Sequence, residues 1–228
     1  MKVILTAPTV FEMAPLIELL DEQGVKTSFS TYTYNEIDFE IVVTGVGAVK
    51  TAFSMSQLHS MGSIDLAIQV GLAGAYDRDL TLGDVVIIGS DRYGDIGVEE
   101  SNGDFTSVNE LGLEEDNQFP FTQGKLETEL KFNPKSIVVV DGITVNTVSG
   151  TEHTIARRKA KYSPQVETME GAAFYYACKI LDIQCFQLRA ISNYVEPRNR
   201  DNWKIAEAIS NLKTNFFSIL PLINHYRK

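Results

Sequence analysis

Two glutamates and an asparagine carry the groups of this chain best suited to acid–base and hydrogen-bonding chemistry. Glu170 lies in the expected first turn of a helix, and Asn193 follows an apolar strand predicted over Phe186–Ile191. Glu12 comes just after the first strand of the chain. Ligands of open α/β sheets bind outside the carboxyl ends of the strands, so these side chains are candidates for one site. A glutamate near a helix start also favours the helix dipole, and that structural role stays open for both glutamates.

A length of 228 residues fits one α/β domain over residues 1–228, and we expect a mixed twisted central sheet flanked by helices. The turn-like pair Asn35-Glu36 predicts an antiparallel hairpin between strands over Ser28–Tyr34 and Ile37–Thr44. Asp141-Gly142 is a second hairpin signal, with one bent strand as the alternative. We expect further strands at Val3–Ala7, Asp65–Val70, Leu82–Ile88, Ser136–Val140 and Ile143–Val148. We expect further helices at Ala14–Glu22, Ala48–Met61, Thr154–Lys161 and Lys204–Ile219.

The charge balance disfavours several classes of partner. The 228 residues include 20 basic and 30 acidic side chains, and the pI is near 4.8, so the surface is unsuited to phosphate backbones or anionic lipid. We therefore expect neither a nucleic-acid partner nor a membrane partner. Pro8 cuts short the apolar run that begins after Lys2, which predicts no signal peptide and no membrane span and favours a cytoplasmic location.

The cysteines and histidines indicate neither a redox centre nor a metal site. Cys178 and Cys185 lack the CxxC spacing of redox or zinc sites, so we expect two reduced thiols in the core. His59, His153 and His225 are scattered and lack the spacing of metal ligands. We expect no metal and no cofactor.

Two glycine-containing segments after predicted strands are candidates for contact with a planar ligand. Gly45-Val46-Gly47 lacks the third glycine and the downstream acid of a dinucleotide fingerprint, so we interpret it as a close approach of the backbone to ribose or base. Gly71-Leu72-Ala73-Gly74 has few large side chains to keep a base away from the backbone, and a tight turn explains its glycines equally well.

Other polar segments have two interpretations each. His153 either contacts a substrate or is an exposed residue beside a helix. The basic cluster Arg157, Arg158, Lys159 and Lys161 is either a solvated helix face or a source of one cation for a substrate carboxylate. Trp203 follows a turn-rich segment that we interpret as a flap over the site; this side chain either contacts the ligand or packs in the core.

Several of these motifs occur together and in order in a known superfamily. The run Met169–Ala173 followed by Arg189–Asn193 resembles the signature of the purine nucleoside phosphorylases and the methylthioadenosine/S-adenosylhomocysteine nucleosidases. The segments Thr44–Gly47, Gly71–Gly74 and Leu82–Val86 are in the expected order, and the resemblance extends to about Trp203. Within this superfamily the chain is most similar to the futalosine hydrolase family of the alternative menaquinone pathway.

The resemblance implies a role for each candidate residue. Glu12 would orient and deprotonate the attacking water, Glu170 would bind the ribose hydroxyls near the developing sugar cation, and Asn193 would face N7 of the base. It also implies that Asp91–Pro134 builds substrate specificity or a subunit contact, and that the protein is a homo-oligomer. Contacts with the substrate are expected from Val46, Leu72, Ala73, Gly74, His153, Met169, Ser192 and Trp203.

The identity of residue 193 carries information on the substrate. An ionised aspartate only accepts hydrogen bonds, which suits a 6-amino group, whereas asparagine can accept from a protonated N7 and donate to a 6-oxo group. Methylthioadenosine nucleosidases carry aspartate at the matching position, so Asn193 favours hypoxanthine or guanine over adenine. A mismatched buried pair costs on the order of 1 to 3 kcal/mol.

Water is favoured over phosphate as the nucleophile. Phosphorylases of this superfamily place arginines around the anion, whereas Ala7–Met13 contains no basic residue and Gln69 precedes Val70-Gly71. The resemblance therefore predicts cleavage of futalosine, an inosine-like nucleoside with an aromatic carboxylate in place of the 5′ hydroxyl, into hypoxanthine and dehypoxanthine futalosine. The alternatives are a nucleosidase or phosphorylase for inosine, guanosine or methylthioadenosine/S-adenosylhomocysteine, and a nucleoside-binding protein without activity.

Overall fold

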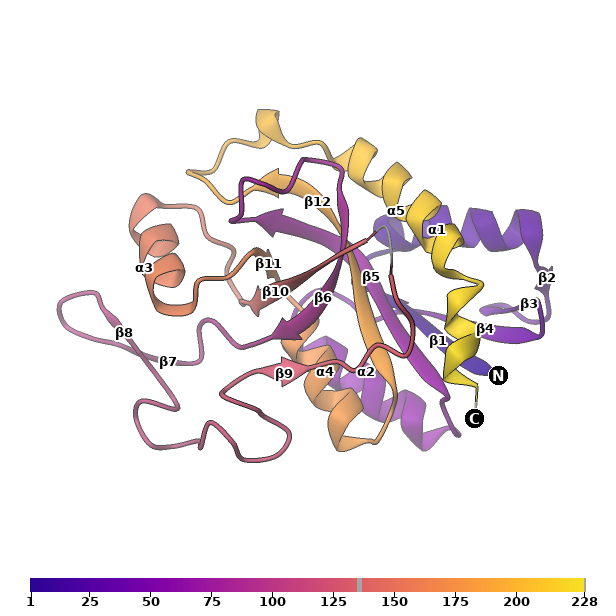
Figure 1. The fold of residues 1–228 in the computed structure, drawn as a ribbon, viewed down its shortest axis with the longest axis horizontal. Helices are drawn as coiled ribbons and strands as arrows, with labels where there is room; N and C mark the ends of the chain where they lie inside the picture. The colour runs from indigo at the N-terminus through magenta and orange to yellow at the C-terminus, as the bar shows by residue number, and fades with distance from the viewer. Residues whose placement is uncertain (135–136, 228) are drawn as a thin grey trace.

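The computed structural model describes residues 1–134 and 137–227, and a mixed sheet lies at its centre (Figure 1). The strands of this sheet are β1 (Lys2–Ala7), β2 (Val25–Lys26), β3 (Thr31–Tyr34), β4 (Ile37–Val43), β5 (Leu66–Ala75), β6 (Val85–Asp91), β9 (Leu126–Glu127), β10 (Val138–Thr144), β11 (Val166–Thr168) and β12 (Cys185–Tyr194). Their order is β11-β10-β6-β12-β5-β1-β4-β3-β2, with β9 paired to β6. β12, β5, β1 and β4 are mutually parallel, whereas β6 runs antiparallel to β12.

Helices cover both faces of the sheet (Figure 1). They are α1 (Val10–Gln23), α2 (Ala48–Ser60), α3 (Glu152–Tyr162), α4 (Gly171–Ile180) and α5 (Ile205–Ile219). α1 and α5 bury Leu16 and Phe216 on one face, and α2 and α4 bury Met55 and Phe174 on the other. Burying an apolar side chain of this size contributes about 1.5 to 3 kcal/mol. The predicted α/β fold with a mixed sheet between helices is confirmed.

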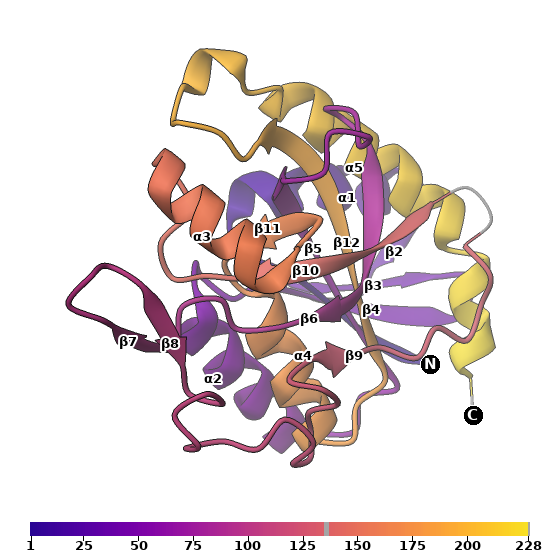
Figure 2. The same ribbon diagram turned by 60° about the vertical axis from the view of Figure 1, so that its left-hand side comes forward.

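Part of the sheet closes on itself through β11. This strand pairs in parallel with β10 and antiparallel with β5, so Glu167 lies opposite both Ile143 and Gly74. β5, β12, β6, β10 and β11 therefore form a closed ring. α3 covers the end of the ring beside β10 and β11 (Figure 2). The ring carries the segment after β11 across the carboxyl-terminal half of β5.

The region between β6 and β10 is mostly irregular. It contains a small hairpin of β7 (Gly97–Glu99) and β8 (Phe105–Ser107), which projects from the molecule below α3 (Figures 1 and 2). The two remaining short helices are η1 (Arg200–Asn202) and η2 (Leu222–Tyr226). The described ends of the chain lie close together at one side of the molecule (Figures 1 and 2).

The predicted hairpin of β3 and β4 is present. Asn35 and Glu36 have φ of 49° and 61°, the left-handed conformation that a two-residue hairpin turn of this type requires. Helix α2 also begins at the predicted residue, Ala48.

Helix α1 begins four residues earlier than predicted, at Val10 instead of Ala14. Thr9 caps it, because its hydroxyl accepts a hydrogen bond from the N–H of Glu12 at 3.2 Å. Pro15 lies inside the helix, where it has no N–H for the usual backbone hydrogen bond, so the sequence signal for the true start is weak. Glu12 therefore lies in the first turn of a helix.

Two glycine-containing segments are parts of strands and not turns. β5 continues through Gly71–Gly74 and ends at Ala75, although the predicted strand ended at Val70. β10 runs through Asp141-Gly142 as one strand with a register shift after Val140, which corresponds to the bent strand and not to the hairpin. Ser136, the predicted start of that unit, lies outside the described residues.

Three further corrections concern Glu170 and the bounds of β12 and β6. Glu170 occupies the position before the first turn of α4, with φ −129° and ψ −25°, and not the first turn itself. β12 extends to Tyr194, and a bulge at Ser192 interrupts its pairing with β5 between Ile191 and Asn193. β6 begins at Val85, because Leu82 lies in the turn before it.

Candidate active site

A pocket of about 320 Å³ lies where the parallel strands β1, β4, β5 and β12 end. β11 runs antiparallel to β5 and delivers Met169 and Glu170 from the opposite side. The pocket is lined by all of the predicted site residues except His153, namely Glu12, Val46, Leu72, Ala73, Gly74, Met169, Glu170, Ser192, Asn193 and Trp203. Sequence analysis did not assign the other lining residues, which are Pro8, Val148, Glu167, Thr168 and Arg198.

Glu12 is fixed in the pocket wall by hydrogen bonds to both carboxylate oxygens. Oε1 accepts from the N–H of Leu72 at 3.0 Å, and Oε2 accepts from the hydroxyl of Thr9 at 2.5 Å. Only 8% of this residue is exposed. The same threonine that starts the helix therefore orients the carboxylate, which lines the cavity in a position suited to a general base.

Glu170 is the second buried carboxylate of the pocket. Its Oε1 accepts a hydrogen bond from the N–H of Gly47 at 3.0 Å, and its Oε2 lies 3.6 Å from Nη1 of Arg189. Gly47 has φ of 99°, which favours glycine at this position. Burial raises the pKa of Glu170, and the charge of Glu12 raises it further, while Arg189 and the Gly47 N–H act in the opposite direction.

Arg189 is a fully buried cation behind the wall of the pocket. Its Nε and Nη2 donate to Oε1 of Gln187 at 3.4 and 3.3 Å, and Nη2 also donates to Gln69. Nη1 has no hydrogen-bond partner within the part of the chain that the structure describes. A Cβ atom at Gly71 would lie 2.5 Å from Nη1 and 2.9 Å from Oε1 of Glu12, so the guanidinium is near both carboxylates only because residue 71 is glycine.

The bulge in β12 places Ser192 and Asn193 together at the far side of the pocket. Bulges re-aim side chains in this way at many functional sites. The hydroxyl of Ser192 donates to Oδ1 of Asn193 at 2.8 Å, and Nδ2 of Asn193 donates to the carbonyl of Tyr194 at 3.0 Å. The amide keeps one further N–H and one further lone pair, which are the donor and the acceptor that the sequence predicted for base recognition.

The segment after β12, interpreted from the sequence as a flap, contributes Arg198 and Trp203 to the lining of the pocket. Glu196 fastens it through hydrogen bonds from Arg78 and Asn202, both at 3.0 Å. The N–H of Lys204 donates to the carbonyl of Ser192 at 2.8 Å and fastens its other end. Trp203 lies between these two attachments and lines the pocket.

Glu167 lines the pocket but is committed to a buried network. Its Oε1 accepts from the N–H of Ser149 at 2.7 Å, and its Oε2 accepts from the hydroxyl of Tyr76 at 3.0 Å and from Arg158 at 3.2 Å. Arg158 is itself buried. This member of the predicted basic cluster therefore neutralises a carboxylate of the protein and is not a candidate for binding one on a substrate.

His153 lies outside the pocket. It is exposed in the first turn of α3 and lines a separate hollow together with Phe105, Arg157 and Lys161. Arg157 donates to the carbonyl of Gly103 at 2.9 Å. Of the two interpretations of His153, the structure supports the exposed residue beside a helix, because α3 covers the outer end of the ring.

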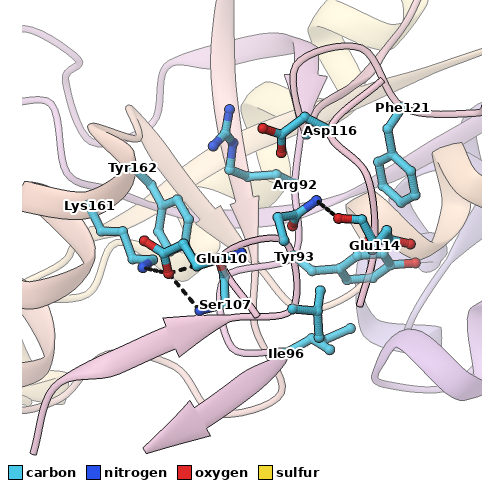
Figure 3. A pocket seen from close by; sticks show the side chains of 13 residues that line it. Arg92, Tyr93, Ile96, Ser107, Glu110, Glu114, Asp116, Phe121, Lys161 and Tyr162 are labelled. Carbon is cyan, nitrogen blue, oxygen red and sulfur yellow. Dashed lines mark hydrogen bonds and ion pairs between the residues drawn. The ribbon is translucent and has the colours of Figure 1, made fainter. Parts of the chain in front are cut away.

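The region between β6 and β9 builds a second pocket of about 260 Å³ against α3 (Figure 3). Lys161 and the N–H of Ser107 both donate to Glu110, and the hydrogen bond from Lys161 is the main cause that lowers the pKa of Glu110 to about 2. None of the predicted site residues lines this pocket. Its acid–base pair is satisfied internally, so the first pocket is the candidate active site.

Three other findings concern metal binding, membrane-spanning helices and the cysteines. Within residues 1–134 and 137–227, no three or more His, Cys, Asp and Glu side chains are grouped so that they could hold a metal ion. Over the same residues, no helix has the length and apolar character needed to cross a membrane. Cys178 and Cys185 are free and buried, as predicted.

Comparison with known proteins relates this chain to nucleoside-cleaving enzymes. A family model described as the phosphorylase superfamily matches residues 2–220. A futalosine hydrolase from Thermus thermophilus is 30% identical over 217 residues, which cover 92% of this chain and 91% of that protein. A 5′-methylthioadenosine/S-adenosylhomocysteine nucleosidase from Colwellia psychrerythraea is 25% identical over 195 residues, which cover 79% of this chain and 80% of that protein. The native structure of futalosine hydrolase from Helicobacter pylori has the same fold, with a TM-score of 0.78, 13% identity and 97% coverage of both chains.

Proposed function

This chain belongs to the phosphorylase superfamily, and on that premise we propose that it is a nucleosidase that hydrolyses futalosine to hypoxanthine and dehypoxanthine futalosine. The reaction would serve the futalosine route to menaquinone. One observation carries the proposal: Glu12, Glu170 and Asn193 line the same pocket, and the buried guanidinium of Arg189 lies near both carboxylates.

Glu12 activates the water. Its Oε1 and Oε2 each accept one hydrogen bond from the protein, and each oxygen keeps a lone pair for a water molecule in the cavity. As the water oxygen bonds to C1′ of the ribose, one water proton passes to Glu12. The buried guanidinium of Arg189 lies behind this wall of the pocket, with Nη1 3.6 Å from Glu170 and close to Glu12 across Gly71.

Glu170 stabilises the sugar. The C1′–N9 bond breaks with its electron pair moving to the base, which leaves positive charge on the ribose. The carboxylate of Glu170 accepts hydrogen bonds from the ribose hydroxyls and places negative charge beside that cation. Arg189 and the N–H of Gly47 oppose the rise in the pKa of Glu170 that burial causes, which favours the ionised form of this group.

Asn193 recognises the departing base. N7 takes up a proton from solvent water as the base departs. The Oδ1 of Asn193, already oriented by Ser192, accepts a hydrogen bond from this N7–H, and the second N–H of the amide donates to the 6-oxo group. A 6-amino group would place its own N–H against the amide N–H of Asn193. Two donors cannot form a hydrogen bond, which disfavours adenine by about 1 to 3 kcal/mol.

The charges of the pocket favour water over phosphate. Its described lining contains three carboxylates, Glu12, Glu167 and Glu170, and one cation, Arg198. Arg158 neutralises Glu167, but a phosphate at the position of the water would meet the charge of Glu12. Two like charges about 4 Å apart repel by about 4 kcal/mol at an effective dielectric constant of about 20.

Chromatographic detection of free hypoxanthine tests the proposal. The purified protein is incubated with futalosine, inosine or methylthioadenosine, each with and without phosphate. We expect phosphate-independent release from futalosine. Release that needs phosphate would assign a phosphorylase, preference for methylthioadenosine would assign an adenine nucleosidase, and no release from any substrate would assign a binding protein.

The variant Glu12→Gln is the matched control for the chemistry. It keeps the size and the hydrogen-bonding ability of residue 12 but removes the base, so we expect turnover at least about a hundredfold slower with ligand binding retained. Near-normal turnover would contradict the role of Glu12 while leaving the substrate assignment intact.

We further propose that the protein is a homo-oligomer in the cytoplasm. Val46, Val49 and Phe53 are 44%, 82% and 67% exposed; Val49 and Phe53 lie one turn apart on α2, and Val46 also lines the pocket. An exposed apolar surface of this kind fits a second copy of the chain, which would then border the site. The free thiols of Cys178 and Cys185 fit a reducing compartment.

A further inference from the structure

We propose that Arg198, held against Trp203, is a subsite for an anionic aromatic group on the 5′ carbon of the substrate and selects nucleosides that carry a carboxylate there. The inference rests on the proposed function and adds to it a residue that distinguishes this substrate from ordinary nucleosides. It was not apparent from the sequence, in which the basic cluster at residues 157–161 offered the obvious cations.

Arg198 is the one cation among the described residues that line the pocket. Its guanidinium carbon lies 5.3 Å from the centre of the Trp203 ring. The side chain is exposed, and no carboxylate within residues 1–134 and 137–227 forms an ion pair with it. The guanidinium donors are therefore available to a ligand.

The backbone holds Arg198 in place before any ligand arrives. Its N–H donates to the carbonyl of Gly150 at 3.3 Å, on the segment that follows Val148. The Glu196 hydrogen bonds and the Lys204 N–H fasten the flap on both sides of it. A cation positioned in this way loses less conformational freedom when it binds an anion.

The other cations near the site are committed elsewhere. Arg189 faces Glu170, Arg158 pairs with Glu167, and Lys161 pairs with Glu110. Arg200 also lies near Trp203, at 5.8 Å, but does not line the pocket. Arg198 is thus the cation that the folded chain presents to the cavity.

The chemistry of the subsite matches an aryl carboxylate. A guanidinium can bind both oxygens of a carboxylate at once. Trp203 offers a flat surface for the ring, and the apolar side chains of Val46 and Val148 also line the cavity. A positive charge is needed here, since the pocket otherwise repels anions through Glu12 and Glu170 and the chain carries a net charge of −10.

Steady-state kinetics with a charged and a neutral substrate test the inference. Futalosine and its carboxylate methyl ester have nearly the same shape, but only the acid carries the negative charge. We compare kcat/KM for both in the wild type, in Arg198→Gln and in Arg200→Gln. Arg200→Gln is the matched control, because it removes a neighbouring cation close to the same tryptophan without touching the pocket lining.

We expect the wild type to favour the acid over the ester by about tenfold to a hundredfold, the range of a charge-assisted hydrogen bond. Arg198→Gln should abolish this preference by raising KM for the acid, whereas Arg200→Gln should retain it. If Arg198→Gln weakens both substrates equally, or if the wild type does not discriminate, the subsite is refuted. Failure of the wild type to cleave futalosine at all refutes the proposed function instead, so the two failures are distinguishable.

Discussion

The variant Gly71→Ala tests the arrangement of Arg189 and the two carboxylates with the smallest possible change. Residue 71 lies in β5, outside the left-handed region, so alanine fits the backbone there. The new methyl group would lie 2.5 Å from Nη1 of Arg189 and 2.9 Å from Oε1 of Glu12. The methyl group is uncharged and takes no part in the reaction, so it would act only by displacing these two groups.

The expected size of the effect follows from the space that is missing. Ordinary contact of a Cβ atom begins at 3.4 Å, so the guanidinium or the strand must shift by about 1 Å. Arg189 has little freedom to move away, because it is fully buried and its other nitrogens donate to Gln187 and Gln69. A misplacement of about 1 Å at a reacting centre costs on the order of a hundredfold in rate, or about 2.7 kcal/mol in the activation barrier.

The assay is initial-rate release of the base, combined with a thermal melt of the same preparation. We expect kcat of Gly71→Ala to fall about a hundredfold while the melting curve stays cooperative. Gly150→Ala is the control: its Cβ would lie 3.7 Å from the Cβ of Arg198, which is ordinary contact, and its activity should stay near that of the wild type. A Gly71→Ala enzyme within about threefold of wild-type kcat would refute the idea that turnover depends on the exact positions of Arg189 and Glu12 beside Gly71.

Three further predictions address the base, a buried acid and the subunit contact. Asn193→Asp should lower kcat/KM for futalosine by about tenfold to a hundredfold and shift selectivity toward methylthioadenosine, since aspartate cannot donate to a 6-oxo group; an unchanged ratio of the two kcat/KM values contradicts this. Burial raises the pKa of Asp91 to about 6, although hydrogen bonds from Gln187 and Thr144 oppose this rise. Between about pH 4 and pH 6 the carboxyl group of Asp91 is therefore protonated in the folded state and ionised in the unfolded state. Its contribution to stability should therefore fall as pH rises through this window, by about 3 kcal/mol in total, and urea unfolding of the wild type and Asp91→Asn at several pH values should show the difference; parallel pH profiles would contradict it. Phe53→Lys should reduce the sedimenting mass to that of one chain, whereas Val25→Lys, at an exposed apolar residue on β2, should not; a wild type that sediments as a monomer rules out the contact.

The sequence was sufficient for the fold class and for three polar residues of the pocket, Glu12, Glu170 and Asn193. Glu12, Glu170 and Asn193 follow buried segments whose apolar pattern is strong, so their meeting at the ends of the strands could be predicted. The hairpin at Asn35-Glu36 was likewise predictable, because its turn chemistry is local.

The glycines misled the prediction for a physical reason. Glycine is a local signal for a turn, but Gly71 and Gly142 lie in strands at places where a neighbouring side chain comes too close for a Cβ atom. At Gly142 a Cβ would lie 3.0 Å from Ile88 and 3.3 Å from Asp91. Such requirements arise from contacts between distant segments, and no window of sequence around the glycine contains them.

Arg198 was overlooked for a related reason. Its role depends on which cations have no carboxylate partner after folding, and the ion pair between Arg158 and Glu167 cannot be predicted from the sequence. His153 is the opposite case. Its side chain is of a type common in active sites, but its position on α3 leaves it exposed and outside the pocket.

The ring closed by β11 has a consequence for the order in which the protein matures. β11 is only three residues long, and it pairs with β5 and β10, strands that end 91 and 22 residues before its first residue, Val166 (166 − 75 and 166 − 144). We therefore expect the chain segment that bears Glu170 to dock only after both of these strands are in place. Contacts of such long sequence separation form late and slowly. Catalytic activity is then a reporter of completed folding, and a refolding chain should regain its helical signal before it regains turnover.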